Sequence, residues 1–600
     1  MTRYVSGDNW QPSDGVELTP EQQTAVLIND RNIAIVAGPG TGKTEVLAQK
    51  ATYLLQTGLC LSPFRILALC YKVDAASNIR ERVKKRCPKD LSSRFCSLTV
   101  DSFIISLVRR FATSLPSWLK IQTDFEIVDE IDLVNYCRSA NTTVFPNQYI
   151  KDVTILQGDV SKATKDIYLY AARNNFFDYN MCHTLAYYII NNNQNIKKLI
   201  SKTYKYIFLD EFQDMNVRHY DILKCLFNNQ YNKICAVGDF NQAIMGWAGA
   251  VPDIFNKFQN DFSSTQHLFT YNHRSTPTIV EFINKVICKL TPSGQQIIKY
   301  SCSKTSQVTN SFIAAYGAYT VEDEATYIAC CIKTILAENI NLHPNDIAII
   351  LKQKTSDYLS TTSQIFTQYS ICVRNEDEKV CKNGLRFQDL MVDSFSKLII
   401  YLLKSKLKII TITEQKELFS LLADILSLDI GRNNNIKKIH NKINEIHEID
   451  FDNIQEWLSQ ILLILPKKKI RYKFYTNQKD FNAAILSVPA LLQKCVENAN
   501  GNLQLAIDEY LGVNFVKLMT THKSKGLEFD TVFFADFRTN SWWTLSRSQT
   551  DKDEALRCFF VGLSRAKTRL FFTSPVNSYP QDIADILNDS QMVVNYNPNT

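Results

Sequence analysis

The stretch Ile33–Thr44 constrains the fold of this chain more than any other. Four apolar residues predict a buried strand, a glycine-rich turn follows them, and Glu45–Ala48 opens a helix. In this strand–loop–helix setting a P-loop closes its backbone N–H groups around phosphate oxygens, aided by the positive end of the helix dipole. Lys43 would reach the β- and γ-phosphates, and the Thr44 hydroxyl would help to hold Mg²⁺.

The predicted loop departs from the strict P-loop pattern at one position, where Ala37 stands in place of a glycine. A chance glycine-rich turn is the alternative interpretation, but the Gly-Lys-Thr sequence favours a nucleotide site. The residues expected to contact the nucleotide here are Ala37, Gly38, Pro39, Gly40, Thr41, Gly42, Lys43 and Thr44.

Composition limits the class of protein without deciding it. With 600 residues the chain is too long for one core, so several domains are expected. A net charge of +7 permits a nucleic-acid partner. Sixteen cysteines without a C-x-x-C pair, and eight dispersed histidines, show no zinc-ligand spacing. Reduced thiols in a cytoplasmic protein are the simpler interpretation.

No targeting or membrane segment is predicted. The polar N-terminus lacks the apolar core of a signal peptide, and the apolar run Ile461–Leu465 is far too short to span a bilayer. The basic run that follows, Pro466–Arg471, is either a nuclear address or a solvated basic turn, and we favour the turn.

Strands alternate with helices along the first half, which predicts an α/β fold with a parallel sheet. A helix begins near Thr19, where Gln22 either completes an N-terminal cap or presents its amide to an adenine edge. Later strands deliver Asp210–Asp214 and Gly238–Gln242 at their carboxyl ends. Acidic residues placed there are what a Mg²⁺–nucleotide site needs opposite a P-loop.

The second half repeats the alternating pattern, and helical periodicity interrupts each half. We expect two α/β domains, each carrying a mainly helical insertion. The expected parts are residues 1–108 and 203–272 (first α/β domain), 109–202 (first insertion), 273–380 and 512–600 (second α/β domain with a short tail) and 381–511 (second insertion).

The order of these motifs resembles the superfamily 1A DNA helicases of the UvrD/Rep/PcrA family. The resemblance runs from Leu18 to about Thr573 and rests on all the motifs together. The matching segments are Ile66–Arg82, Thr99–Phe103, Asp210–Asp214, Val237–Ala250, Tyr271–Thr276, Val516–Phe529 and Glu554–Lys567. The resemblance implies two RecA-like P-loop NTPase domains.

The resemblance also implies roles in ATP hydrolysis. Lys43, Thr44 and Asp210 would hold the triphosphate and Mg²⁺, and Glu211 would orient or deprotonate the attacking water. Gln242 would sense the γ-phosphate. Gln22 would read the adenine, Glu528 would accept hydrogen bonds from the ribose, and Arg274 and Arg565 would act as arginine fingers from the second sheet.

The resemblance also implies a track for single-stranded DNA. The expected contacts with single-stranded DNA, through base stacking or the backbone, are Tyr71, Ser102, Phe103, Trp247, Thr520 and His522. Several positions depart from the family pattern: Met245 and Ala248 replace Tyr and Arg, His273 replaces an adenine-stacking tyrosine, and Asp101 replaces a histidine.

We therefore expect an ATP-dependent translocase or helicase with 3′→5′ polarity, acting on single strands and single-strand/duplex junctions. The alternative is a DNA-sensing ATPase subunit that regulates a separate nuclease and unwinds little itself. Because the sequence ends soon after the last motif, we expect no fused nuclease domain.

Overall fold

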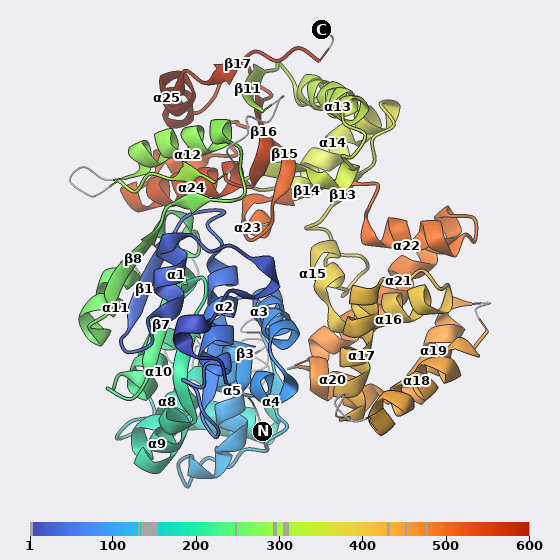
Figure 1. Cartoon of the computed structure of the whole chain (residues 1–600). Helices are drawn as coiled ribbons and strands as arrows, with labels where there is room; N and C mark the ends of the chain where they lie inside the picture. The colour runs from blue at the N-terminus through green and yellow to red at the C-terminus, as the bar shows by residue number, and fades with distance from the viewer. Residues whose placement is uncertain are drawn as a thin grey trace. The chain divides into compact units, whose positions relative to one another are not determined.

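The computed structural model describes residues 4–129, 133, 154–246, 249–251, 253–291, 297–303, 311–428, 433–450, 453–475 and 477–598. The chain forms two compact units (Figure 1). Unit 1 consists of Met1–Arg274 and Ile298–Ser303, and unit 2 consists of Ser275–Ile297 and Lys304–Thr600.

Unit 1 is built on a six-stranded parallel sheet with the order β3-β2-β6-β7-β1-β8. Its strands are β1 (Ile33–Ala37), β2 (Arg65–Cys70), β3 (Phe95–Thr99), β6 (Tyr204–Leu209), β7 (Lys233–Gly238) and β8 (Thr265–Phe269). Every residue of β1 is buried, as its run of apolar residues predicts. Because β6, β7 and β1 are neighbours and parallel, the loops that follow them emerge at one edge of the sheet.

Helices cover this sheet. They are α1 (Pro20–Leu27), α2 (Lys43–Gln56), α3 (Val73–Arg86), α4 (Lys89–Ser92), α5 (Val100–Arg110), α10 (Val217–Phe227) and α11 (Ile254–Phe262). The start of α1 confirms the predicted cap: the Thr19 side chain accepts from the backbone N–H of Gln22, and the Gln22 side chain accepts from the backbone N–H of Thr19.

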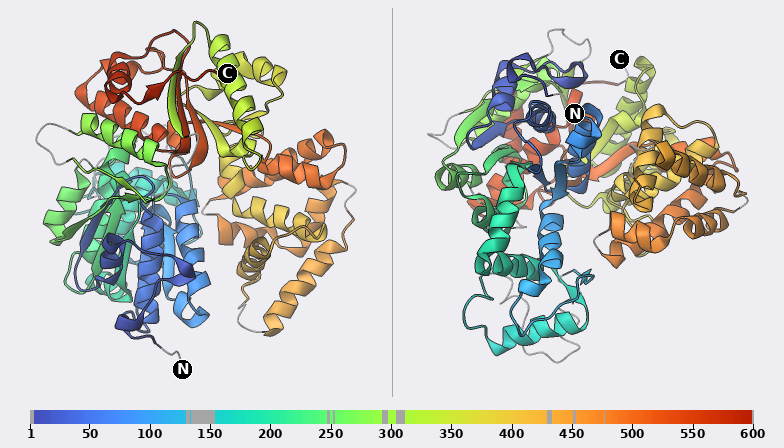
Figure 2. Two further views of the ribbon diagram at one scale, coloured as in Figure 1. Left: turned by 45° about the horizontal axis from the view of Figure 1, so that its top comes forward. Right: turned by 60° about the horizontal axis from the view of Figure 1, so that its bottom comes forward.

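The described part of the first inserted segment is mainly helical. It contains α7 (Lys162–Arg173), α8 (Tyr179–Asn192) and α9 (Gln194–Thr203), with one short strand pair, β4 (Glu126–Ile127) and β5 (Phe176–Phe177). Helix α8 packs against both α5 and α10, so the insertion is anchored to helices of the sheet layer (Figure 2).

Unit 2 contains a seven-stranded parallel sheet with the order β13-β14-β12-β15-β16-β11-β17. Its strands are β11 (Phe312–Gly317), β12 (Ile347–Leu351), β13 (Val373–Asn375), β14 (Val516–Thr520), β15 (Phe529–Phe534), β16 (Ala566–Ser574) and β17 (Val593–Val594). Its helices are α12 (Pro277–Leu290), α13 (Val321–Glu338), α14 (Thr355–Gln368), α23 (Thr521–Ser524), α24 (Gln549–Leu563) and α25 (Gln581–Ser590). The two parallel sheets confirm the predicted α/β class.

A second helical segment has a core of its own within unit 2 (Figure 2). It consists of α15 (Phe387–Val392), α16 (Ser394–Lys406), α17 (Ile412–Leu426), α18 (Asn433–His447), α19 (Ile454–Ile464), α20 (Lys467–Phe474), α21 (Gln478–Asn498) and α22 (Leu503–Leu511). Lys467, Lys468 and Lys469 are exposed, Arg471 is buried, and the run opens α20, so the predicted turn is a helix instead. Pro466 is the residue directly before the first helical residue and has a non-helical backbone conformation.

The chain crosses between the units three times. Unit 1 extends to Arg274, two residues beyond the expected boundary, and Ile298–Ser303 returns to it. The returning segment carries β10 (Ser301–Cys302), which pairs in parallel with β9 (Tyr271–Asn272). Within the described residues no helix is both long enough and apolar enough to span a membrane.

Candidate nucleotide site and DNA-facing residues

The P-loop links β1 to α2 through two backbone conformations that glycine adopts more readily than other residues. Gly40 and Gly42 have φ angles of 70° and 77°, and Gly42 directly precedes the first helical residue, Lys43. A Cβ at Gly40 would also lie 2.6 Å from the Cβ of Arg274. The loop therefore keeps its backbone close to neighbouring chain and presents a helix N-terminus, the setting in which backbone N–H groups bind phosphate.

Lys43 lies over this loop. Its Nζ donates to the carbonyl oxygens of Ala37 and Gly38, at 3.1 Å each. The buried Thr41 hydroxyl donates to Gly38 as well, at 2.9 Å. The carbonyl of Ala37, the residue that departs from the strict pattern, is thus used to hold the ammonium group beside the loop.

Two acidic residues follow β6 at the same edge of the sheet. Asp210 is 5% exposed, and burial together with the neighbouring charge of Glu211 raises its pKa to about 7, against the opposing effect of Lys43. Burial disfavours the ionised carboxylate of Asp210. A divalent cation bound beside it would favour the ionised form, so the position is suited to a metal ligand. Glu211 has φ 48°, a left-handed conformation that is uncommon outside glycine.

Hydrogen bonds connect Glu211 to Gln242 through two residues that sequence analysis did not single out. Gln213 Nε2 donates to Glu211 Oε2 at 2.6 Å, and Gln213 Oε1 accepts from the backbone N–H of Asp239 at 2.9 Å. Gln242 Nε2 in turn donates to Asp239 Oδ2 at 2.7 Å. Asp239 is fully buried, and burial raises its pKa. We call Glu211, Gln213, Asp239 and Gln242 the acid–amide relay.

Gln22 joins the P-loop to the segment that follows β8. Its Nε2 donates to the carbonyl of Thr41 at 2.9 Å and lies 3.5 Å from Nε2 of His273. Asn272 Nδ2 donates to the carbonyl of Pro39 at 2.8 Å, and the His273 backbone N–H donates to that of Gly40 at 2.8 Å. The Gln22 amide therefore has two partners: its oxygen caps α1 at Thr19, and its nitrogen contacts the P-loop at Thr41.

Arg274 belongs to unit 1, which corrects the expectation that it comes from the second sheet. The reason is local: its backbone N–H donates to Asn272 Oδ1 at 2.9 Å, and Asn272 is itself bonded to the P-loop. The segment Ile298–Ser303 also packs against the P-loop. Tyr300 is 4% exposed, and its Cζ would lie 2.2 Å from a Cβ at Gly38.

In unit 2, Glu528 and Arg565 lie directly before β15 and β16. Arg565 is 2% exposed, and its Nε donates to the carbonyl of Val561 at 2.9 Å. Glu528 is exposed and forms an ion pair with Lys567 at 2.8 Å. The backbone N–H of Phe529 donates to the carbonyl of Arg565, so the two predicted residues share one edge of this sheet.

The residues predicted to contact DNA have different environments. Tyr71 directly follows β2 and is half-buried, and burial raises its pKa to about 12. Thr520 ends β14 and donates its backbone N–H to Asp377 at 2.7 Å, and His522 lies on α23. Trp247 lies outside the described residues.

The other two lie at the start of α5. Ser102 is half-buried and bonds to the capping residue Thr99 through its backbone N–H. Phe103 is 1% exposed and packs edge-on against Tyr204. Its ring therefore belongs to the core and is not available to stack on a base, which corrects the prediction for this side chain.

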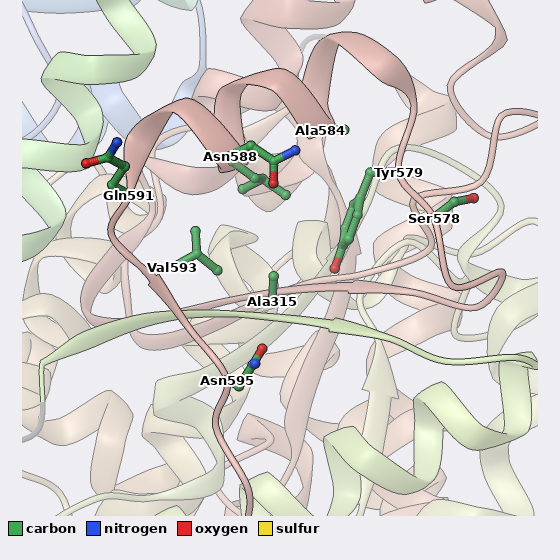
Figure 3. A pocket seen from close by; sticks show the side chains of 9 residues that line it. Ala315, Ser578, Tyr579, Ala584, Asn588, Gln591, Val593 and Asn595 are labelled. Carbon is green, nitrogen blue, oxygen red and sulfur yellow. The ribbon is translucent and has the colours of Figure 1, made fainter.

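A cavity of about 540 Å³ lies apart from all these residues, in unit 2 between β11, α25 and β17 (Figure 3). Tyr579 points into it, and its hydroxyl lies at hydrogen-bond distance from the carbonyls of Tyr316 and Phe572, at 3.0 and 2.9 Å. Tyr579 thus packs back on the sheet, and the chain between β16 and α25 is a turn, not a paired hairpin.

Comparison with known proteins agrees with this architecture. Residues 18–166 and 140–263 match the UvrD/REP helicase N-terminal domain, and residues 267–373 and 382–577 match the UvrD-like helicase C-terminal domain.

The individual relatives share between 24% and 31% of their aligned residues with this chain. The chain is 25% identical to a probable DNA helicase II homolog of Mycoplasma capricolum over 96% of this chain and 87% of that protein. It is 24% identical to the ATP-dependent DNA helicase PcrA of Staphylococcus aureus over 93% and 83%, and 31% identical to a probable DNA helicase of Mycoplasma pneumoniae over 45% and 55%. Since the two domain matches together span most of the sequence, this chain belongs to the UvrD-like helicase family.

Proposed function

We propose that this protein is an ATP-dependent single-stranded-DNA translocase and DNA helicase with 3′→5′ polarity. The observation that carries the proposal is the arrangement at one edge of the unit 1 sheet. There the P-loop, Asp210 and the acid–amide relay follow the neighbouring strands β1, β6 and β7. The names of the similar proteins, which include ATP-dependent DNA helicase PcrA, support the same activity.

The residues at this edge fit Mg²⁺–ATP. Glycines in left-handed conformations open the loop backbone at the start of α2, and Lys43 rests on carbonyls that it can exchange for phosphate oxygens. Bound ATP supplies the phosphoryl group, and Mg²⁺ supplies charge neutralisation. Thr44 and Asp210 would hold the metal, and Lys43 would neutralise the β- and γ-phosphates.

Each remaining residue has a proposed role in hydrolysis. Glu211 orients or deprotonates the attacking water, and Gln242 responds to the γ-phosphate through its bond to Asp239. Gln22 recognises adenine and Glu528 the ribose. Arg274 and Arg565 neutralise charge that develops during transfer.

The coupling to DNA rests on relative movement of the two units as ATP binds and is hydrolysed. Tyr71 and Trp247 would stack on bases, while Ser102, Thr520 and His522 would contact the strand at its backbone. The described cysteines are all free thiols, which supports a reducing compartment, the cytoplasm.

A second function is favoured by the turn after β16. In the resembled helicases a hairpin after the last motif commonly separates the strands of the duplex. The chain after β16 is an unpaired turn, which favours an ATPase subunit that senses DNA and regulates a separate nuclease. Strand displacement by the chain alone, compared with the same assay after adding candidate nuclease partners, distinguishes the two functions.

The proposal is tested by ATP hydrolysis with and without single-stranded DNA. The parent protein should hydrolyse ATP, and an oligonucleotide should stimulate turnover. Lys43→Ala should abolish both rates and leave the melting temperature unchanged, since Lys43 is half-buried over a loop. Lys84→Ala, on the exposed side of α3, is the matched control. Parental turnover in Lys43→Ala would refute the site assignment.

A further inference from the structure

Three side chains from separate parts of unit 1 converge at a point outside the proposed nucleotide site. Asp101 lies in the first turn of α5, His183 on α8 and His219 on α10. The Nε2 atom of His183 lies 2.7 Å from Asp101 Oδ1, and the Nε2 atom of His219 lies 2.9 Å from the same oxygen. The three candidate ligand atoms all lie within 4.8 Å of one another.

The surroundings of these atoms suit a bound cation. Both histidines are 3% exposed, and their rings are inclined by 75° with centroids 4.8 Å apart. The side chain of Asp101 is 37% exposed.

We propose that Asp101, His183 and His219 bind one divalent transition-metal ion of the Zn²⁺ class. Two imidazoles and one carboxylate are a recurrent donor set for such ions, with further positions open to water. The ion would tie the inserted helix α8 and helix α10 to α5.

Binding of one ion requires all three ligand atoms to move. Zn²⁺ binds nitrogen and carboxylate oxygen at about 2.0–2.2 Å, which sets neighbouring ligand atoms of a tetrahedral ion roughly 3.3 Å apart. The two nitrogen–oxygen separations of 2.7 and 2.9 Å would therefore widen by about half an ångström. The two histidine nitrogens span up to 4.8 Å and would approach each other by about 1.5 Å, so binding requires the His183 and His219 side chains to move as well as Asp101.

The residues are far apart in sequence, which hides the site from a search for ligand spacing. Asp101 is 82 residues from His183 and 118 from His219. The same distances also fit an alternative without an ion, a hydrogen-bonded triad in which both imidazoles donate to the Asp101 carboxylate. The two arrangements differ in whether the protein takes up metal, and this difference can be measured.

The test uses the full chain, stripped with a chelator and dialysed. We expect Zn²⁺ titration against a chromophoric indicator to give one tight equivalent, and elemental analysis after dialysis to find about one Zn²⁺ per chain. Substitution with Co²⁺ should give the visible absorption of a nitrogen- and oxygen-ligated site, without the strong charge-transfer bands of thiolate ligation. Failure of the parent protein to retain an equivalent of Zn²⁺ overturns the proposal and leaves the hydrogen-bonded triad.

Variants assign the ion to these ligands. Asp101→Asn preserves size and hydrogen bonding, and His183→Gln removes an imidazole. Each should weaken Zn²⁺ binding by more than the roughly 10–100-fold that loss of an outer-shell partner costs. His343→Gln, at an exposed histidine of unit 2, should bind like the parent. Zn²⁺ retained at parental affinity by both Asp101→Asn and His183→Gln would place the ion elsewhere, on thiols for example, and would overturn the proposal.

Discussion

Glu211 occupies a backbone conformation that the surrounding structure must impose. Its φ of 48° places the residue in the left-handed region, and its carboxylate is held by the amide of Gln213. Unfavourable backbone conformations persist where neighbouring contacts determine them, and they gather at functional sites. The orientation of this carboxylate is therefore a property of the relay as well as of the residue itself.

Glu211→Gln should bind ATP but hydrolyse it far more slowly, because an amide of nearly the same shape cannot accept a proton. Turnover should fall by at least the roughly 10²–10⁴-fold that a general base contributes. The measurement pairs nucleotide affinity by equilibrium fluorescence with single-turnover hydrolysis. A variant that neither binds ATP nor accumulates a complex with DNA would remove Glu211 from the catalytic role.

Gln213 offers a separate test of the relay, since it touches Glu211 and Asp239 but belongs to neither the P-loop nor the metal ligands. Gln213→Met removes both hydrogen bonds and keeps the volume. We expect kcat to fall by about 10²-fold, as misplacement of a catalytic group does, with little change in KM. Gln230→Met, at an exposed glutamine, is the control. Equal kcat in the two variants would show that the relay does not position Glu211.

The positions of single site residues could be predicted from the sequence where those residues lie in contiguous motifs. Lys43, Asp210 and Glu211 follow buried apolar strands, so their placement at one edge of a parallel sheet could be predicted. The bonding of Gln213 to Asp239 could not, because it depends on the side-chain packing of two neighbouring strand ends. The triad of Asp101 with two histidines depends in the same way on how three helices pack.

At the scale of elements, α13 carries a buried carboxyl beneath the second sheet. Glu324 is fully buried and accepts from the backbone N–H of Asp536 at 3.1 Å. Burial raises its pKa from an ordinary value of 4.5 to about 7. A pKa raised by folding means that stability is fully present below about pH 4.5 and is lost as the pH rises through 7.

Glu324→Gln should therefore stabilise unit 2 at pH 8 and have little effect near pH 4.5. The amide still accepts the Asp536 bond but carries no charge to bury, so the gain at pH 8 should be about 3 kcal/mol. Thermal unfolding at both pH values measures it. Asp323→Asn, at the exposed preceding residue, should show no such pH dependence. A variant that is more destabilised at pH 8 than at pH 4.5 would show that Glu324 is ionised and stabilising.

The turn between β16 and α25 bears on how well the protein unwinds duplex DNA. Pro575, Pro580 and the inward-packed Tyr579 leave no paired strand between β16 and α25 that could split a duplex. Because melting costs about 1.4 kcal/mol per base-pair step, the lone chain should translocate on single strands far better than it unwinds duplexes. Unwinding of a 3′-tailed duplex of several tens of base pairs, at rates matching translocation, would contradict this.

Elements with strong local signals were predictable, and weakly patterned ones were not. The Thr19 cap and the apolar run of β1 determine their own structure. Strands β9 and β10 have two residues each, too few to show periodicity, so the return of Ile298–Ser303 to unit 1 could not be predicted. The basic start of α20 resembles a turn because proline precedes it, yet proline is equally suited to the first turn of a helix.

At the scale of the molecule, the proposed motor consists of two parallel-sheet units joined by three chain crossings. Nucleotide binding at the edge of the unit 1 sheet would bias the two units between two arrangements, and the crossings would absorb the change. Such a motor moves on DNA only if hydrolysis is coupled to that change, so ATPase activity alone does not establish translocation.

The most direct measurement is displacement of streptavidin from single-stranded oligonucleotides biotinylated at one end, with ATP and excess free biotin. A 3′→5′ translocase should displace streptavidin from the 5′ end much faster than from the 3′ end. Displacement should require hydrolysis, so Lys43→Ala and Glu211→Gln should both fail. Displacement from the 3′ end, equal rates at the two ends, or none despite DNA-stimulated hydrolysis would contradict the account.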